Sequence, residues 1–249
     1  MKTNSNNNLQ YQAIILAGGL GTRLQSAVSN VPKCIAPVAG KPFLHYVINY
    51  FQQQGVNEFI FSLGYMSEII EEYLQLHHQN LVYQIVVEKE PLGTGGAIQL
   101  ACTKATQKDV VILNGDTFFE VDVQSIMSFH QQQQAACTLS LKTMQQFDRY
   151  GVVEMDKNST IYSFKEKQYY DQGLINGGVY VVNIHQFLSK TFPKTFPQKF
   201  PQKYSFEKEY LEKYVGEGKF TGIEQQGYFI DIGIPEDFNK AQEDFKSKF

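Results

Sequence analysis

A glycine-rich stretch with one arginine follows the first apolar run of the chain. The run YQAII leads into LAGGLGTRL, residues 16–24, which has glycines at positions 18, 19 and 21 and an arginine at position 23. Glycine lets a backbone approach a ligand closely, and backbone amides at a strand-to-helix crossover can cradle phosphate. We therefore interpret the stretch as a phosphate-binding turn. The alternative is a tight turn beside surface cations.

Two familiar phosphate-binding motifs do not fit this stretch. A dinucleotide fingerprint needs a third glycine where Leu24 stands, and a P-loop needs serine or threonine where Pro42 follows Gly-Lys. What remains is a glycine turn that holds a triphosphate, with Arg23 beside it. Lys33 follows ten residues later in the proline-stiffened VPKCIAP. Two fixed cations along a phosphate chain suit phosphoryl or nucleotidyl transfer, where catalysis is largely positioning and charge neutralisation.

Two aspartates each follow an apolar run and lie within two residues of a glycine. Asp116 ends ILNGD, and Asp231 lies in YFIDIG. A carboxylate at the end of a buried strand is costly unless it caps a helix or binds a cation. Magnesium prefers one or two carboxylates together with phosphate oxygens. The pair therefore predicts a Mg²⁺ site, with helix capping as the alternative for each residue.

Further polar and glycine-rich stretches suggest where the rest of a substrate would lie. EKEPLGTGGAI has glycines at positions 93, 95 and 96, and we expect this bare backbone to let a flat base or a sugar lie against the chain. FKEK and INGG provide Glu166, Lys167 and Asn176, which can bind sugar hydroxyls and a phosphate. Each of these signals is weak alone, because charged strand ends are usually solvated.

The elements that must position these residues alternate along the first half of the chain. Apolar runs at 11–16, 57–63, 82–88 and 109–116 predict strands, and amphipathic stretches at 43–54, 67–77 and 94–105 predict helices. This alternation indicates βαβ units and a parallel sheet. Ligands gather at the carboxyl ends of such strands, and both LAGGLGTRL and NGD lie there.

The pattern changes beyond about residue 135. CTLSLKTM, GVVEMD, TIYSFKEK and LINGGVYVVN read as strands that continue the same sheet, and a helix is expected from about Ser205. Phe-Pro pairs recur between 192 and 201, which predicts an irregular connection, with a substrate lid as the alternative. The predicted fold is α/β: a Rossmann-like, mixed, mostly parallel sheet flanked by helices, with antiparallel additions in the C-terminal half.

Composition sets the limits of this interpretation. The 249 residues are 43% hydrophobic and 19% charged. We expect a flexible tail at 1–10 and one domain at 11–249, with a nucleotide-binding part at 11–135 and a sugar-phosphate-binding part at 136–249. A net charge of −3 argues against nucleic-acid or membrane binding. Three widely spaced cysteines predict no disulfides and favour the cytoplasm.

An ordered set of motifs runs along the whole chain after its tail: LAGGLGTRL…PK, PLGTGGA, LNGD, EK, NGGVY and DIG. This set resembles the sugar-1-phosphate nucleotidylyltransferase family. The resemblance implies an enzyme that joins a nucleoside triphosphate to a sugar 1-phosphate, releases pyrophosphate and serves surface polysaccharide synthesis. Gln168 stands where proline is common, and NGG stands where NAG is frequent, which bears on sugar preference.

The resemblance also implies a role for each matching position. Arg23 and Lys33 would be catalytic, and Asp116 and Asp231 would bind Mg²⁺. The nucleotide would be held by Leu16, Gly18, Gly19, Gly21, Thr22, Glu88, Gly93 and Thr94. The sugar phosphate would be held by Asn114, Gly115, Gly151, Glu166, Lys167 and Asn176.

The sequence says least about the substrates. A carboxylate such as Glu88 can accept hydrogen bonds from both N1–H and the exocyclic amine of guanine, which favours GTP. The pairing of EKEPLGTGGAI with LINGGVY most resembles guanylyltransferases that act on D-glycero-D-manno-heptose 1-phosphate. Mannose 1-phosphate with GTP, and uridylyl or thymidylyl transfer to a hexose phosphate, are the alternatives. A regulatory subunit that binds nucleotide sugars without turnover is the non-enzymatic alternative. A homo-oligomer is left open.

Overall fold

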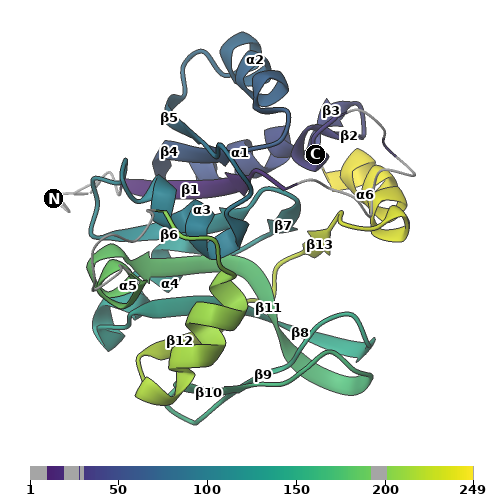
Figure 1. Ribbon diagram of the computed structural model, residues 1–249. Helices are drawn as coiled ribbons and strands as arrows, with labels where there is room; N and C mark the ends of the chain where they lie inside the picture. The colour runs from purple at the N-terminus through teal and green to yellow at the C-terminus, as the bar shows by residue number, and fades with distance from the viewer. Residues whose placement is uncertain (1–9, 20–27, 29–30, 192–200, 249) are drawn as a thin grey trace, which may run out of the picture.

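A seven-stranded sheet forms the centre of the molecule (Figure 1). The computed structural model describes residues 10–19, 28, 31–191 and 201–248. The strand order is β12-β8-β11-β6-β1-β4-β5. The bounds are β1 (Tyr11–Ala17), β4 (Val56–Leu63), β5 (Val82–Val87), β6 (Asp109–Asn114), β8 (Cys137–Phe147), β11 (Tyr170–Asn183) and β12 (Phe220–Glu224).

Strand direction divides this sheet into two parts. β6, β1, β4 and β5 are parallel to one another, as the βαβ pattern predicts. β11 runs antiparallel to both β6 and β8, and β12 pairs with β8 in parallel. The predicted mixed sheet with antiparallel additions in the C-terminal half is therefore confirmed.

Helices cover both faces of the sheet, so central strands such as β1 are buried on both sides. Ala13 and Ile15 belong to one hydrophobic core, and Ile14 between them belongs to the other. The first core takes residues from α1 (Phe43–Gln53), α2 (Ser67–His77), α4 (Val123–Gln133) and α6 (Pro235–Lys248). The second takes residues from α3 (Gly93–Ala101), α5 (Ile184–Thr191) and η2 (Glu207–Glu212).

Two of the expected sheet strands lie elsewhere. GVVEMD and TIYSFKEK do form strands, but β9 (Val153–Met155) and β10 (Ile161–Phe164) pair with each other in a separate hairpin. Isolated bridges join this hairpin to the main sheet at Val152–Ile175 and Thr160–Thr221. The side chains of β9 and β10 are partly exposed, which suits a hairpin that covers the sheet. Period-two alternation alone does not distinguish a strand of the main sheet from a strand of such a hairpin.

Short elements complete the fold. The structure adds β2 (Pro37–Val38), β3 (Lys41–Pro42), β7 (Thr117–Phe119), β13 (Phe229–Asp231), η1 (Lys33–Ile35) and η3 (Val215–Glu217). β7 and β13 pair with each other, so two distant parts of the chain meet at one point. Among the described residues, no helix combines the length and the apolar run that crossing a bilayer requires. Residues 1–9 of the tail expected at 1–10, and residues 192–200 of the Phe-Pro segment expected at 192–201, lie outside the described residues.

Candidate active site

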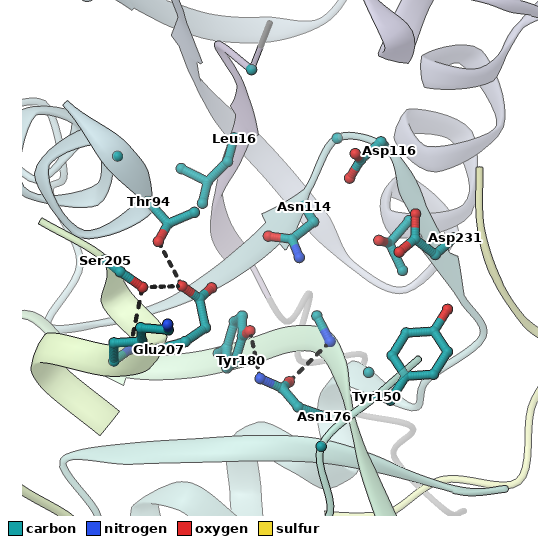
Figure 2. Close-up of a pocket in the computed structure, with 18 of the residues that line it drawn as sticks. Leu16, Thr94, Asn114, Asp116, Tyr150, Asn176, Tyr180, Ser205, Glu207 and Asp231 are labelled. Atoms are coloured by element: carbon teal, nitrogen blue, oxygen red, sulfur yellow. Dashed lines mark hydrogen bonds between the residues drawn. The ribbon is translucent and has the colours of Figure 1, made fainter. Parts of the chain in front are cut away.

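A cavity of about 750 Å³ opens where the carboxyl ends of β1 and β6 meet the antiparallel half of the sheet (Figure 2). Its lining includes every predicted site residue that the structure describes: Leu16, Gly18, Gly19, Lys33, Glu88, Gly93, Thr94, Asn114, Gly115, Asp116, Gly151, Glu166, Lys167, Asn176 and Asp231. Gly21, Thr22 and Arg23 lie outside the described residues. The topology therefore gathers residues as far apart in the sequence as Leu16 and Asp231 around one space.

The two described glycines after β1 have different surroundings. A Cβ on Gly18 would lie 2.9 Å from Glu88 Oε1 and 3.2 Å from the amide nitrogen of Gly64, so Gly18 lets β1 and its neighbours approach closely. A Cβ on Gly19 would have no atom of the described residues within 4 Å. Gly19 is therefore bare backbone beside the cavity, as a phosphate-binding turn requires.

Three charged side chains meet at one end of the cavity. Lys33 Nζ lies 3.2 Å from Asp116 Oδ2. Asp116 comes directly before β7 and Asp231 ends β13, and these two strands pair with Asp231 opposite Thr117. The Ile232 amide donates to the carbonyl oxygen of Asp116 at 3.0 Å, which fixes the two loops together.

The capping alternative for these aspartates is not supported by the described contacts. α4 is capped by Asp122, whose Oδ1 accepts from the Ser125 amide at 2.9 Å. Asp231 Oδ1 accepts from the Gly233 amide at 2.8 Å, before α6 begins at Pro235. Neither Asp116 nor Asp231 therefore serves as the side-chain cap of the helix that follows it.

The electrostatics at this end of the cavity favour a cation. Burial, and after it the charge of Asp116, raises the pKa of Asp231 to about 6, although the Gly233 amide and Lys33 act in the opposite direction. Lys33 thus compensates the negative charge of the two carboxylates only in part. Within the described part of the chain, no group of three His, Cys, Asp or Glu forms a metal site. Two carboxylates completed by substrate phosphates are a donor set that suits a divalent cation.

Glu88 lies beside the glycine stretch that follows β1. Its Oε2 accepts from the Leu92 amide at 2.7 Å, and its Oε1 faces Gly18. Burial raises the pKa of Glu88, and the hydrogen bond from Leu92 lowers it in part. One carboxylate oxygen is therefore used by the protein's own turn, and among the described residues no hydrogen bond reaches the other.

The glycines of PLGTGGA have a different purpose from the one expected. A Cβ on Gly95 would lie 2.2 Å from the Tyr204 ring, and one on Gly96 would lie 2.1 Å from the Gln202 carbonyl oxygen. Gly93 has φ +69°, and its Cβ would lie 2.6 Å from the Tyr204 carbonyl oxygen. The bare backbone is thus occupied by the chain itself, which corrects the expectation that a base or sugar lies on all three glycines.

This packing brings together a polar group that the sequence did not reveal. Thr94 Oγ1 donates to Glu207 Oε2 at 2.7 Å, and Ser205 Oγ donates to the same oxygen at 2.8 Å. The Phe206 amide in turn donates to Thr94 Oγ1 at 2.8 Å. Ser205 in YSFEKEY signals a helix start. The carboxylate that it shares with Thr94 joins parts of the chain more than a hundred positions apart, and this contact has no local signature.

The remaining predicted residues lie on the C-terminal half of the cavity. Glu166 and Lys167 are exposed at its rim. Asn176 Nδ2 donates to the Tyr180 hydroxyl at 2.9 Å, and its Oδ1 accepts from the Gly178 amide at 3.1 Å. The Asn176 amide therefore stabilises its own strand as well as lining the cavity (Figure 2).

Comparisons with known proteins agree with this geometry. A family model described as nucleotidyl transferase matches residues 12–248. A D-glycero-alpha-D-manno-heptose 1-phosphate guanylyltransferase from Aneurinibacillus thermoaerophilus is 45% identical over 239 residues, covering 94% of this chain and 98% of that protein. One from Campylobacter jejuni is 41% identical over 231 residues, covering 91% and 96%.

Solved structures give the same result. The crystal structure of HddC from Yersinia pseudotuberculosis complexed with GMP-PN matches with a TM-score of 0.81 and 35% identity. The match covers 94% of this chain and 99% of that one. Since the family model and these relatives match the sequence almost from end to end, the chain belongs to the nucleotidyl transferase family.

Proposed function

We propose that this protein transfers GMP from GTP to D-glycero-α-D-manno-heptose 1-phosphate and releases pyrophosphate. The observation that carries the reaction class is the meeting of Gly19, Lys33 and the two aspartates, Asp116 and Asp231, at one end of a cavity. The choice of GTP and of the heptose phosphate rests on the names of relatives that match this chain along nearly their full length. The cytoplasm, which supplies GTP, is the compartment we propose.

The chemistry needs no covalent intermediate and no general base. The phosphate oxygen of the sugar is already an anion that can attack the α-phosphorus while pyrophosphate leaves on the opposite side. The chain has to align the two substrates and neutralise their charge. Lys33 and the Gly19 amide would serve this role, and Arg23 would add a second cation. Asp116 and Asp231 would hold Mg²⁺, which supplies further positive charge when bound.

The walls of the cavity suggest how the two substrates divide it. We assign the guanosine part to the side formed by Leu16, Gly18, Glu88, Gly93 and Thr94. The free Glu88 oxygen would accept a guanine N–H there. We assign the sugar phosphate to the side formed by Asn114, Gly115, Gly151, Glu166, Lys167 and Asn176.

A substrate panel tests the proposal. The purified protein is incubated with Mg²⁺, each of GTP, ATP, UTP and dTTP, and each of the heptose, mannose and glucose 1-phosphates. Pyrophosphate release is measured and the product mass is determined. We expect GTP with the heptose phosphate to give the highest kcat/KM. Preference for UTP or dTTP would overturn the base, and preference for mannose 1-phosphate would overturn the sugar. No release with any pair would favour a binding subunit.

A further inference from the structure

A short segment between β8 and β9, residues 148–152, forms the wall of the cavity beside the two aspartates. We call it the connecting segment. Tyr150 lines the cavity on the same side as Asp231 (Figure 2). The Tyr150 ring meets the edge of Phe229 with centroids 6.0 Å apart, and Phe229 lies two residues before Asp231 on β13.

One side of the connecting segment is attached to the aspartate end of the cavity. Arg149 Nη2 lies 2.6 Å from Asp237 Oδ2. Asp237 is in the first turn of α6, which begins four residues after Asp231. The Arg149 guanidinium also lies over the Tyr150 ring, 5.7 Å from its centroid. The ion pair therefore joins the segment to the first turn of α6, a few residues beyond Asp231.

The other side of the segment is attached to the rim that carries Glu166 and Lys167. A Cβ on Gly151 would lie 2.4 Å from the Lys165 carbonyl oxygen, so the two backbones are in close contact. The Lys165 amide donates to the Val152 carbonyl oxygen at 2.8 Å. Lys165 directly precedes Glu166 and Lys167. Any movement of the segment would thus shift this rim relative to the aspartates.

An aromatic contact extends the connection to the second aspartate. Phe229 meets Phe119 edge to face, with centroids 5.4 Å apart, and the two residues are paired across β13 and β7. Phe119 lies three residues after Asp116. The connecting segment is therefore packed against the strand pair that holds both carboxylates.

We propose that Arg149 is a positioning residue. Its ion pair with Asp237 holds the connecting segment, so that Tyr150 closes the cavity beside Asp231 and the Glu166–Lys167 rim keeps a fixed place relative to both aspartates. This inference rests on the proposed function, because the rim is the side assigned to the sugar phosphate. Loss of the ion pair should weaken sugar-phosphate binding and leave GTP binding unchanged.

Exposure of the ion pair makes the test possible. The side chains of Arg149 and Asp237 are 43% and 20% exposed. Because the guanidinium partner is well exposed to water, this ion pair contributes little to the free energy of folding. Variants at these positions should therefore remain folded. The variants are Arg149→Gln, Asp237→Asn and the double variant. Lys190→Gln is the matched control, because it breaks a surface ion pair in which Lys190 Nζ lies 2.7 Å from Glu217 Oε1. Neither of these two residues lines the cavity.

The kinetics are measured with whichever triphosphate and sugar phosphate the wild type uses best, so an error in the substrate assignment does not affect this test. We expect each single variant to raise the KM of the sugar phosphate about fivefold and to change the KM of the triphosphate less than twofold. The double variant should be no worse than either single one, because both remove the same interaction. Lys190→Gln should match the wild type.

Three outcomes would overturn the proposal. An unchanged sugar-phosphate KM in both single variants would show that the ion pair positions nothing. Equal rises in both KM values with a lower melting temperature would indicate a purely structural role. Additive effects in the double variant would show that Arg149 and Asp237 act independently of each other.

Discussion

At the scale of single residues, Lys33 differs from an ordinary surface lysine. Its side chain is only 17% exposed and lies against Asp116. The short helical turn η1 places it next to the buried Cys34. The cost of ordering a long flexible side chain is therefore met during folding, before any substrate binds. A preorganised cation of this kind is most effective where negative charge develops during the reaction.

Replacement of Lys33 tests this role. Lys33→Met keeps the length of the side chain and removes its charge, and we expect kcat to fall about 10²-fold or more. The measurement is pyrophosphate release at saturating concentrations of both substrates. Lys41→Met is the control, because Lys41 is exposed and does not line the cavity. A kcat for Lys33→Met within threefold of the wild type would contradict the assigned role. The same loss is expected for Arg23→Ala, from the sequence resemblance alone.

Asp231 predicts a pH-dependent stability. Its pKa of about 6 lies above the ordinary value of 3.8, so the metal-free folded state binds this proton more tightly than the unfolded chain. Stability from this group is therefore greatest below about pH 4 and is lost as the pH rises to about 6. Asp231→Asn keeps the acceptor for the Gly233 amide and removes the charge.

We expect Asp231→Asn to raise the free energy of unfolding in EDTA at pH 8 by about 1–3 kcal/mol. The difference from wild type should disappear at pH 4. Urea unfolding at the two pH values measures it. Added Mg²⁺ should stabilise the wild type more than the variant, because the second carboxylate ligand is gone. A difference of equal size at pH 4 and pH 8 would show that the effect does not come from the carboxyl group.

At the scale of elements, α3 shows what sequence patterns reveal and what they do not. The amphipathic pattern predicts the helix at 94–105, and the structure has it at Gly93–Ala101. The glycines at its start were expected to meet a ligand, and they meet Gln202 and Tyr204 instead. Local patterns report turns and periodicity, whereas the partner of a glycine face is set by tertiary packing. Ser205 and Glu207 were missed for the same reason.

Gly96→Ala tests this packing. Its Cβ would lie 2.1 Å from the backbone oxygen of Gln202, so the segment at 202–204 would have to move. We expect a loss of about 1–3 kcal/mol, which lowers the melting temperature by about 3–10 °C. Gly216→Ala is the control, because a Cβ there would meet nothing within 4 Å. Equal melting temperatures for the two variants, measured by calorimetry, would contradict the packing described here.

At the scale of the whole molecule, the mixed sheet explains why one cavity collects residues from both halves of the chain. β6 from the parallel half lies beside β11 from the antiparallel half, so Asn114 and Asn176 both line the same space. The parallel half was predictable because strands and helices alternate at regular spacing. The separation of the β9–β10 hairpin from the main sheet was not predictable, since the alternation that predicts a strand does not name its partner strand. The ion pair of Arg149 with Asp237 leaves no periodic signal in the sequence.

Because both halves line the cavity, a bound substrate should contact both of them and stabilise the folded state. A ligand that binds only the folded state stabilises it by about 2.7 kcal/mol at 100 times its Kd, which is about 5–10 °C in melting temperature for a chain of this size. We expect this shift with Mg²⁺ and an α,β-methylene analogue of GTP, which cannot transfer its nucleotide. Adding the sugar phosphate should raise the melting temperature further.

The Asp231→Asn variant tests the part that the metal plays. In the presence of Mg²⁺, the GTP analogue should raise the melting temperature of this variant less than that of the wild type. In EDTA, the analogue should raise the melting temperatures of the two proteins by similar amounts. The corresponding ATP analogue is the control, and an equal shift with both analogues would contradict selection of guanine.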